Sequence, residues 1–372
     1  MIVCKFGGSS LADAAQIRKA CQIMLDDRER KIMVVSAPGK RPTVTGDDKI
    51  TDLLIHLVHE REAGRDGHEA GRIIKERVLE MASDLGLMDG TARDLVQVLD
   101  QLAFQVDARE PESRASVLAL GEIISGRLIT AYFWQMGVKA RYVDPREAGL
   151  ILSYQNGLTE IMEESYDKLA PLAQEEGIVV FPGFFGRTAQ GHTMTFSRGG
   201  SDISGAVLAA AVNASLYENW TDRDSVQAVN PDLIPHALPL EEMSYREMRE
   251  LAYIGFSIIH PEALEPVIRR NIPIRICNTN DPLAAGTRIV AQRSHIDRVL
   301  TGIAAGDHFC TINLRRVLIN QEVGILSRIL TIFAQLAINV HHVPTGIDSV
   351  SIVVRKDHFP LEKECVLLDR LK

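Results

Sequence analysis

The chain opens with Ile2-Val3-Cys4-Lys5-Phe6-Gly7-Gly8-Ser9-Ser10, an apolar stretch that ends in a lysine and two glycines. Glycines allow the backbone to approach a ligand closely and to present its N–H groups to an anion. A lysine at the end of a strand can neutralise charge on a transferring phosphoryl group. The stretch therefore predicts a first β-strand with a phosphate-binding turn, although a plain strand-to-helix turn with a solvated lysine fits it equally well. The chain contains no Walker A sequence, GxxxxGK[ST].

Beyond this stretch, short apolar runs alternate with amphipathic stretches over the first two thirds of the 372 residues. The expected strands are Ile2–Phe6, Lys31–Ser36, Lys139–Val143, Ile178–Pro182, Ala214–Trp220 and Ile274–Asn278. The expected helices are Ala14–Arg28, Asp52–Glu62, Ala115–Met136, Tyr166–Glu176 and Ser201–Val212. This alternation predicts an α/β domain with a mostly parallel sheet. Such sheets bind ligands at the carboxyl ends of their strands.

A second glycine-rich block, Phe196-Ser197-Arg198-Gly199-Gly200-Ser201-Asp202, precedes an expected helix of small residues. The planar guanidinium of Arg198 suits a carboxylate or a phosphate. Ser201 and Asp202 fit an ordinary helix N-cap, but a cap does not account for the Arg-Gly-Gly sequence before them. Glu122 lies among the apolar residues of an expected helix. Its carboxylate either faces solvent or points at a substrate amine, and the spacing favours solvent.

Three further segments carry weaker signals. Gly183-Phe184-Phe185-Gly186 follows an expected strand, but a loop after a buried strand often contains glycines. Residues 219–224, Asn-Trp-Thr-Asp-Arg-Asp, end another strand with polar side chains that suit a nucleotide ribose, a metal ion or merely a capped turn. The polar, turn-rich residues 40–48 indicate a mobile surface loop.

The composition is that of a soluble globular protein, with 46% hydrophobic and 24% charged residues. A formal net charge of −8 argues against extended contact with nucleic acid or an anionic membrane. Five widely spaced cysteines without a CxxC pair predict reduced thiols, not a zinc site or a disulfide framework. The start of the chain does not resemble a signal peptide, and no apolar run is long enough to span a membrane. We therefore expect a cytoplasmic protein.

The composition changes near residue 293, where the polar residues 292–298 predict a linker. We expect a catalytic domain over residues 1–293 and a small domain over residues 299–372. The small domain reads as strand, helix, strand, strand and helix, at Thr311–Arg315, Ile325–Ala337, Asn339–Pro344, Ser349–Arg355 and from Leu361. This is the ferredoxin-like βαββαβ pattern without its last strand, which indicates a truncated chain with an exposed sheet edge. A partner subunit would cover that edge, so we expect a homodimer or a higher homo-oligomer.

Taken in order, the motifs resemble those of aspartate kinases (aspartokinases) of the amino-acid kinase superfamily over nearly the whole chain. The landmarks are Lys5–Ser10, Val34–Ala37, Ile50–Leu54, Gly121-Glu122, Gly183–Gly186, Arg198–Asp202, Trp220–Asp222, Ser244–Glu247, His260-Pro261, Ile272–Ile274 and Asn278-Thr279. The last unit, with Gly324–Leu326 and Ile338–Val340, resembles an ACT domain, the amino-acid-sensing module of these enzymes. The resemblance implies a three-layer αβα amino-acid kinase fold followed by an incomplete ACT domain.

The resemblance also implies a reaction, in which the γ-phosphoryl group of ATP passes to the side-chain carboxylate of L-aspartate as the first step towards lysine, threonine and methionine. It implies ATP and Mg²⁺ as cofactors, and feedback by lysine or threonine at the ACT domains. Lys5 and Asp202 would be catalytic, and Asp202 would orient Lys5 and the metal-bound phosphates. The implied nucleotide-binding residues are Lys5, Gly7, Gly8, Ser9, Thr221 and Asp222. The implied substrate-binding residues are Ser36, Thr51, Glu122, Arg198 and Ser201, with Glu122 on the amine and Arg198 on the α-carboxylate.

Two departures from the family pattern concern the nucleotide. Many aspartokinases carry the sequence Thr-Asp-x-x-Gly-x-Tyr-x-x-Asp-Pro-Arg in this segment. The corresponding residues 221–232 of this chain lack the aromatic residue and the final arginine. Many also carry a lysine at the position of Ser257, and Arg223 is a candidate to compensate for the missing cations. Two alternatives therefore stay open: a non-catalytic amino-acid sensor built on a kinase fold, and a kinase for a related acid such as glutamate.

Overall fold

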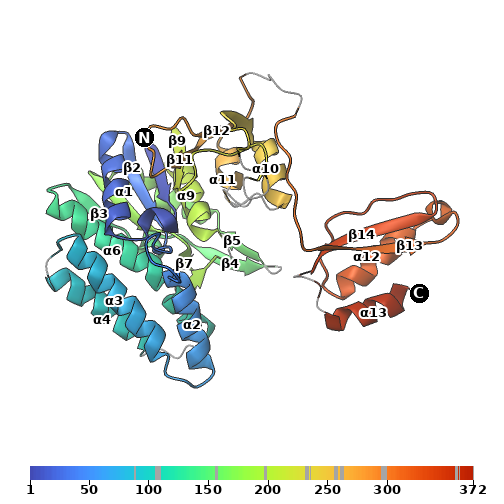
Figure 1. Cartoon of the computed structure of the whole chain (residues 1–372), viewed down its shortest axis with the longest axis horizontal. Helices are drawn as coiled ribbons and strands as arrows, with labels where there is room; N and C mark the ends of the chain where they lie inside the picture. The colour runs from blue at the N-terminus through green and yellow to red at the C-terminus, as the bar shows by residue number, and fades with distance from the viewer. Residues whose placement is uncertain are drawn as a thin grey trace. The chain divides into compact units, whose positions relative to one another are not determined.

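The chain forms two compact units, Met1–Ala304 and Ala305–Lys372, in a computed structural model (Figure 1). The structure describes residues 1–87, 89–104, 110–155, 158–196, 199–230, 234, 236–254, 259, 264–294, 300–356, 359 and 361–371. The sequence had placed the boundary between the units earlier, between residues 293 and 299. Each unit has its own hydrophobic core.

An eight-stranded sheet forms the centre of the first unit, in the order β10-β12-β11-β9-β1-β2-β6-β3. In that order the strands are Glu242–Ser244, Thr287–Val290, Ile274–Asn278, Leu216–Thr221, Ile2–Phe6, Arg30–Val35, Ile178–Pro182 and Ala140–Tyr142. Neighbouring strands run parallel except β11 and β12. The predicted α/β fold with a mostly parallel sheet is confirmed, and the strand that opens the chain lies in its middle.

Helices cover both faces of this sheet, and successive residues of β1 belong to different cores (Figure 1). Cys4 and Phe6 pack into one core with α1 (Ala14–Asp26), α2 (Ile50–Glu62), α3 (His68–Asp84), α4 (Asp89–Phe104) and α6 (Leu120–Gln135). Val3 packs into the other core with α8 (Glu164–Leu169), α9 (Gly200–Ala211), α10 (Tyr245–Ile254) and α11 (Leu264–Arg269). Because side chains alternate along a strand, Lys5 lies on the same face as Val3. The three-layer αβα arrangement is therefore present.

The predicted strands of the first unit agree closely with the observed ones, whereas the helices differ more. The expected helix Tyr166–Glu176 is a short α8 followed by the 3-10 turn η2 (Ala170–Gln174), because Pro171 has no N–H with which to continue an α-helix. The helices α3 and α4 had not been predicted. Their signal was present in α3, where Ile74, Val78 and Met81 recur at helical spacing and are buried. Two short hairpins, β4–β5 (Leu152–Gln155, Leu158–Ile161) and β7–β8 (Phe185–Arg187, Thr193–Thr195), were also missed.

One helical stretch passes a length and composition test for a membrane span, contrary to the sequence expectation. It runs over Pro111–Gln135, through α5 (Pro111–Leu118) and α6, where a single longer helix had been predicted over Ala115–Met136. Of its most apolar window, 72% is buried inside the fold. Such burial is what a core helix of the first unit requires, and α6 indeed packs beneath the sheet.

The second unit contains β13 (Phe309–Arg315), the 3-10 turn η4 (Ile319–Gln321), α12 (Ile325–Gln335), β14 (Ser349–Arg355) and α13 (Leu361–Leu371). β13 and β14 pair antiparallel along their whole length. The strand expected over Asn339–Pro344 is present only as one isolated bridge, which joins His342 to Val353. Pro344 lacks an N–H for a ladder, which limits regular pairing at the end of this segment.

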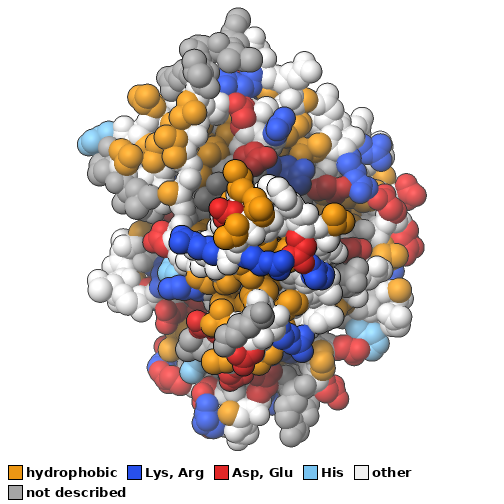
Figure 2. Space-filling view, turned by 90° about the vertical axis from the view of Figure 1, so that its right-hand side faces the viewer, with side chains coloured by type: hydrophobic (Ala, Val, Ile, Leu, Met, Phe, Trp, Pro, Cys, Tyr) orange, Lys and Arg blue, Asp and Glu red, His pale blue; other side chains and the backbone are white. Residues whose placement is uncertain are grey.

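Charges of both signs are distributed over the surface. On the face drawn in Figure 2, basic and acidic side chains lie among apolar ones. Many exposed charges are paired, such as Arg72 with Glu69 and Glu76 on α3, and Lys168 with Glu164 on α8. Exposed pairs contribute about 0–1 kcal/mol each to stability. The buried charged groups are therefore the ones whose positions call for a specific explanation.

Candidate active site

Lys5 and Asp202 form an ion pair at the carboxyl edge of the central sheet. The Nζ of Lys5 lies 2.5 Å from Oδ1 of Asp202, and the two side chains are only 10% and 13% exposed. Lys5 is near the end of β1, and Asp202 lies in the first turn of α9. An ammonium group in a site largely shielded from water exerts a stronger field than the same group in bulk water.

Asn219 on β9 holds this ion pair in position. It lies directly beside Lys5 in the parallel pairing of β1 with β9 and is 1% exposed. Its Nδ2 donates to Oδ1 of Asp202 at 2.9 Å, and its Oδ1 accepts a long hydrogen bond of 3.5 Å from Nζ of Lys5. Sequence analysis gave Asn219 no role of its own. The sequence signal that could have pointed to Asn219 is an amide side chain within a strand that lies in the interior of the sheet.

Gly7 and Gly8 form a tight turn beside the ion pair. The N–H of Gly7 donates to the carbonyl of Trp220 at 3.0 Å, and the carbonyl of Gly8 accepts from the N–H of Gly39 at 2.8 Å. A Cβ on Gly8 would lie 2.9 Å from the carbonyl oxygen of Ala37, closer than Cβ atoms come in proteins. A Cβ on Gly7 would lie 3.6 Å from Nζ of Lys5, so glycine there leaves the ammonium group open. Ser9 follows in the 3-10 turn η1 (Gly8–Leu11), and not in an α-helix.

Ser36 and Thr51 lie on either side of the loop that contacts this turn. Ser36 follows β2, and its N–H donates to the carbonyl of Phe6 at 3.2 Å. The N–H of Ile50 donates to the carbonyl of Pro38 at 3.1 Å, which fixes the start of α2, where Thr51 lies in the first turn. Both hydroxyl-bearing residues are partly exposed. They are therefore accessible to a ligand at this edge.

Glu122 is buried, so the solvent exposure that its spacing favoured is wrong. It lies in the first turn of α6 and is 4% exposed. Its carboxylate accepts hydrogen bonds from the main-chain N–H groups of Ala37 and of Glu122 itself, and its Oε2 has no hydrogen-bond partner within the part of the chain that the structure describes. Burial raises the pKa of Glu122 to about 8, against the opposing effect of these hydrogen bonds. An unpartnered buried carboxylate oxygen is suited to an incoming ammonium group.

Glycines also let the start of α9 approach the loop after β6. A Cβ on Gly183 would lie 2.7 Å from Cα of Ser201, and a Cβ on Gly200 would lie 2.8 Å from Cα of Phe184. Phe184 has a φ of 75°, and its N–H donates to Oγ of Ser204 at 3.2 Å. A left-handed conformation costs a residue such as phenylalanine about 1–3 kcal/mol and is concentrated at functional sites. The segment that was a weak sequence signal thus carries backbone strain next to Ser201.

The N-cap of α9 is Gly199, with a φ of 61°. Ser201 and Asp202 lie inside the first turn, so the ordinary N-cap explanation considered for them does not apply. Ser197 and Arg198 lie outside the described residues. The structure therefore places Asp202 and the buried Ser201 at this edge, and the position of Arg198 stays a prediction.

Thr221 and Asp222 end β9 at the same edge. The hydroxyl of Thr221 donates to the carboxylate of Asp222 at 3.1 Å, and the carbonyl of Thr221 accepts from the N–H of Thr279 at 2.9 Å. The hydroxyl of Thr279 donates to Oγ of Ser10 at 2.7 Å, and both residues are 1% exposed. These bonds connect the ends of β9 and β11 to the glycine turn. Ser257, where many aspartokinases have a lysine, lies outside the described residues.

The described residues include no group of three or more His, Cys, Asp or Glu side chains arranged to hold a metal ion. Magnesium in kinases nevertheless needs only one or two protein carboxylates, because phosphate oxygens and water supply the other ligands. Asp202 meets that smaller requirement at the edge where the glycine turn lies. The residues present therefore fit a magnesium ion that arrives with a nucleotide.

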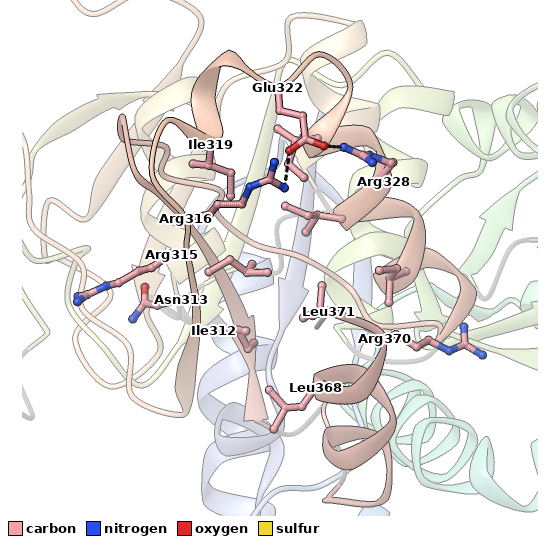
Figure 3. A pocket seen from close by; sticks show the side chains of 14 residues that line it. Ile312, Asn313, Arg315, Arg316, Ile319, Glu322, Arg328, Leu368, Arg370 and Leu371 are labelled. Atoms are coloured by element: carbon pink, nitrogen blue, oxygen red, sulfur yellow. Dashed lines mark hydrogen bonds and ion pairs between the residues drawn. The ribbon is translucent and has the colours of Figure 1, made fainter.

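A second concave site lies wholly within the smaller unit (Figure 3). It has a volume of about 740 Å³ between β13, α12 and α13, with an apolar wall that includes Ile312, Ile329 and Leu368. Figure 3 shows Glu322 between two arginines: it forms an ion pair of 2.7 Å with Arg316 and a second ion pair with Arg328. Two more arginines, at positions 315 and 370, line the pocket. Its lining thus has an excess of positive charge.

The sequence matches the amino acid kinase family over residues 1–278. The chain belongs to this family. Its curated relatives are aspartokinases: it is 41% identical to Aspartokinase 3 of Bacillus subtilis, over 100% of this chain and 82% of the relative.

Solved structures of aspartokinases superimpose on all or nearly all of this chain. The aspartate kinase of Clostridium acetobutylicum is 32% identical and superimposes with a TM-score of 0.83, over 100% of this chain and 82% of the other. Aspartokinase III of E. coli, solved with aspartate and ADP, is 26% identical with a TM-score of 0.78, over 95% of this chain and 78% of the other. A second structure of that enzyme contains lysine and aspartate. The chain is thus an aspartokinase within the amino acid kinase family.

In this aspartokinase, the carboxyl edge of the sheet brings together most of the residues that the family resemblance implied. Lys5, Gly7 and Gly8 lie beside Asp202, and the neighbouring strand ends and helix starts carry Ser9, Ser36, Thr51, Glu122, Ser201, Thr221 and Asp222. Their roles toward substrate and nucleotide stay predictions. Asn219 and Gly39 are additions from the structure, and neither had been singled out from sequence.

Replacement of Lys5 by alanine should lower kcat by about a hundredfold or more, the order of loss found when a single charge-stabilising group is removed. The fold should survive although Asp202 loses its cation, because Asn219 still donates to its carboxylate and the apolar cores are unchanged. Steady-state phosphorylation assays and a melting curve measure the two effects. Lys168→Ala, which removes an exposed lysine of α8, is the matched control. Unchanged turnover in Lys5→Ala would show that its phosphate role is misassigned.

The binding of aspartate should depend on pH through Glu122, whose pKa is about 8. Below that value most of the carboxyl is protonated, and only the ionised form attracts an ammonium group, so affinity should rise as pH rises from about 6 to about 8. The change can reach about tenfold per pH unit. Isothermal titration across this range measures it. Glu122→Gln should bind more weakly with a flat profile, while Glu164→Gln on the surface of α8 should behave like the parent; a flat profile for the parent contradicts the assignment.

Proposed function

We propose that the cleft at the carboxyl edge of the sheet transfers the γ-phosphoryl group of ATP to the side-chain carboxylate of L-aspartate, giving 4-phospho-L-aspartate and ADP. The observation that carries the proposal is the Lys5–Asp202 ion pair of 2.5 Å, beside the Gly7-Gly8 turn, in a chain 41% identical to an aspartokinase. The E. coli relative solved with aspartate and ADP supports the same pair of reactants.

The transfer requires no covalent enzyme intermediate. An oxygen of the aspartate side chain attacks the γ-phosphorus, the bond from this phosphorus to the oxygen bridging it to the β-phosphorus breaks, and that electron pair leaves with ADP. Negative charge is spread over the transferring group in a loose transition state. The ammonium group of Lys5 stabilises this charge, and the main chain at Gly8 and Ser9 offers N–H groups to the phosphates. The N–H of Gly7 is bonded to Trp220, so Gly7 contributes by shaping the turn beside Lys5. Positioning and charge stabilisation account for the catalysis.

The substrate is held by opposite charges at its two ends. Glu122 binds the α-ammonium group, since its buried Oε2 has no partner among the described residues. Arg198 binds the α-carboxylate, for which a planar guanidinium is suited. Ser36, Thr51 and Ser201 add hydrogen bonds. This arrangement presents the side-chain carboxylate, and not the α-carboxylate, to Lys5.

Thr221 and Asp222 line the nucleotide site at the end of β9, next to the glycine turn. Asp202 orients Lys5 and the phosphates that carry magnesium. When bound, Mg²⁺ neutralises phosphate charge, and Asp202 is the carboxylate placed to hold it. Arg223, exposed beyond β9, is our candidate for the cation that replaces the lysine many relatives carry at position 257.

The product is the first intermediate of lysine, threonine and methionine synthesis, and the smaller unit is the proposed regulatory part. We assign it as an ACT-type domain that binds lysine or threonine and pairs with a second copy of the chain in a homodimer or higher oligomer. The E. coli relative solved with lysine supports an amino-acid effector. Arg316 and Arg328, which Figure 3 shows on either side of Glu322, provide positive charge for the α-carboxylate of such a ligand. A biosynthetic role also supports a cytoplasmic location.

Two alternatives make different use of the same residues. A non-catalytic sensor would bind amino acid and nucleotide without transfer, and the altered nucleotide segment favours it. The Lys5–Asp202 pair favours the enzyme, because simple binding does not need a buried ammonium group at the phosphate end. A glutamate kinase would use the same Glu122 and Arg198, since these recognise any α-amino acid, so a side-by-side test of both acids is needed.

Purified protein with Mg-ATP and aspartate should form an acyl phosphate that hydroxylamine traps as a hydroxamate. The phosphoryl group is carried by a carboxylate oxygen, and hydroxylamine attacks such activated carboxyls. Colorimetric detection of the hydroxamate measures the reaction, with Lys5→Ala as the blank. Glutamate in place of aspartate should give little product. Binding of nucleotide and aspartate without hydroxamate contradicts the kinase, whereas equal product from glutamate contradicts the substrate assignment.

Lysine or threonine should inhibit the full chain and raise its melting temperature. A ligand that binds only the folded state stabilises it in proportion to the logarithm of its concentration, by about 2.7 kcal/mol at a hundredfold excess over its dissociation constant. The hydroxamate assay and a thermal melt, each with the two amino acids in turn, measure these effects. Leucine serves as an amino acid without an expected effect. If neither lysine nor threonine binds or inhibits, the regulatory proposal fails.

A further inference from the structure

Arg77 is a buried arginine that lies outside the proposed set of catalytic and binding residues. It lies in the middle of α3, and its side chain is 1% exposed. Its guanidinium donates to three main-chain carbonyls: Asp48 at 2.7 Å, Ala12 at 2.9 Å and Gly39. Three carbonyls from two separate segments, the end of η1 and the connection between β2 and α2, thus converge on one side chain of a third.

Each of these segments adjoins a part of the proposed cleft. Ala12 directly follows η1, the turn that begins at Gly8. Gly39 follows Ser36 by three residues, and Asp48 precedes Thr51 by three residues at the start of α2. The guanidinium therefore links the phosphate turn, the segment after β2 and the entry of α2. A shift of any one of them would change the distance between proposed phosphate and substrate groups.

Gly39 transmits the contact directly to the phosphate turn. Its carbonyl accepts from Arg77, and its N–H donates to the carbonyl of Gly8 at 2.8 Å. The approach is so close that a Cβ on Gly39 would lie 2.6 Å from the carbonyl carbon of Gly8. Movement at Gly39 therefore cannot leave Gly8 in place.

Stability alone gives a poor account of Arg77. Its neighbours on α3, Ile74 and Val78, fill the same core with apolar side chains. Burial lowers the pKa of Arg77, and Asp47 at 3.4 Å opposes this effect. Replacing a buried charge pair by apolar side chains of similar volume is often neutral or stabilising. A guanidinium here has what an apolar side chain lacks, namely donors for three carbonyls at once.

The loop between these acceptors is closed by its own charges. The main-chain N–H of Arg41 donates to Asp47 at 2.7 Å, and its guanidinium donates to the same carboxylate at 2.8 Å. Burial acts to raise the pKa of Asp47, but the hydrogen bonds from Arg41 and the charges of Arg77 and Arg41 outweigh it and lower the pKa. Within residues 40–48, the loop expected from sequence to be mobile, Asp47 and the carbonyl of Asp48 thus contact Arg77, while residues 42–46 are exposed.

We infer that Arg77 is a positioning residue for phosphoryl transfer, which acts by holding Gly39, and through it the Gly8 turn, at a fixed distance from the start of α2. The inference rests on the proposed kinase function of the cleft. Arg77 touches neither substrate nor nucleotide in this scheme, and its effect reaches the reaction only through the main chain.

The test compares Arg77→Ala with Arg72→Ala, the same substitution at an exposed arginine of the same helix. Arg77→Ala should lower kcat by about tenfold to a hundredfold, because small misplacements of reacting groups have effects of that size. The KM values for aspartate and ATP should change less than kcat. Arg72→Ala should keep both. Low millimolar guanidinium chloride should restore part of kcat in Arg77→Ala and should leave Arg72→Ala unchanged.

The rescue separates positioning from general stability, because an added guanidinium ion fills the vacated site without restoring the covalent link to α3. A folded Arg77→Ala enzyme with kcat within about twofold of the parent overturns the inference. A lowered kcat that guanidinium does not restore also overturns it. Inactivity of the parent enzyme in the hydroxamate assay would instead contradict the proposed function itself.

If Arg77→Ala does not fold, Arg77→Lys replaces it in the test. Lysine keeps the charge but cannot reach three carbonyls with the geometry of a guanidinium. A folded Arg77→Lys enzyme should then lose kcat while its melting temperature stays near that of the parent. Unchanged kcat overturns the inference. Failure of both variants to fold also overturns it, since Arg77 would then be required for folding and not for positioning.

Discussion

The ion pair between Lys5 and Asp202 sets the conditions that the rest of the first unit must meet. Burying an ammonium group without a counter-charge is costly, so Lys5 can stay at this depth only with a carboxylate beside it. That carboxylate comes from α9, on a part of the chain almost two hundred residues away. The start of α9 must therefore lie close to the loop after β6, which Gly183 and Gly200 allow. Asn219 then joins both charges from the neighbouring strand.

The two carboxylates at this sheet edge, the partly buried Asp202 and the buried Glu122, differ in their partners. Asp202 already has a cation 2.5 Å away, so it belongs to the enzyme's own charge arrangement. No cation among the described residues pairs with Glu122, and burial raises its pKa to about 8. The first carboxylate keeps an ammonium group of the enzyme in place, while the second can accept an ammonium group of a ligand. In the proposed reaction, Lys5 and Asp202 would then lie at the phosphate end of the site and Glu122 at the substrate end.

How much of this was visible in the sequence depends on the range of the interaction. Strands such as Ile2–Phe6 and Ile178–Pro182 are apolar over their whole length, so their bounds were predicted closely. Glu122 was misjudged on spacing because α6 is buried on nearly all sides, which removes the polar face that spacing arguments assume. Asn219 depends on the register of β9 against β1, and Arg77 depends on two loops, after η1 and between β2 and α2, that converge on α3. Neither arrangement leaves a local pattern in the chain.

The precision of the cleft is held largely by main-chain contacts, and this explains why its motifs look like simple glycine turns. Gly8 and Gly39 touch backbone to backbone, and the acceptors of Arg77 are carbonyls that every residue type carries. These main-chain contacts themselves therefore require no particular side chain beyond the glycines that keep the approach open. By contrast, the donors that hydrogen-bond to these carbonyls must lie on a rigid element, because donors on a loop would move together with the carbonyls. A long helix packed against the core, such as α3, meets that requirement, which is why its single buried arginine can act on both loops together.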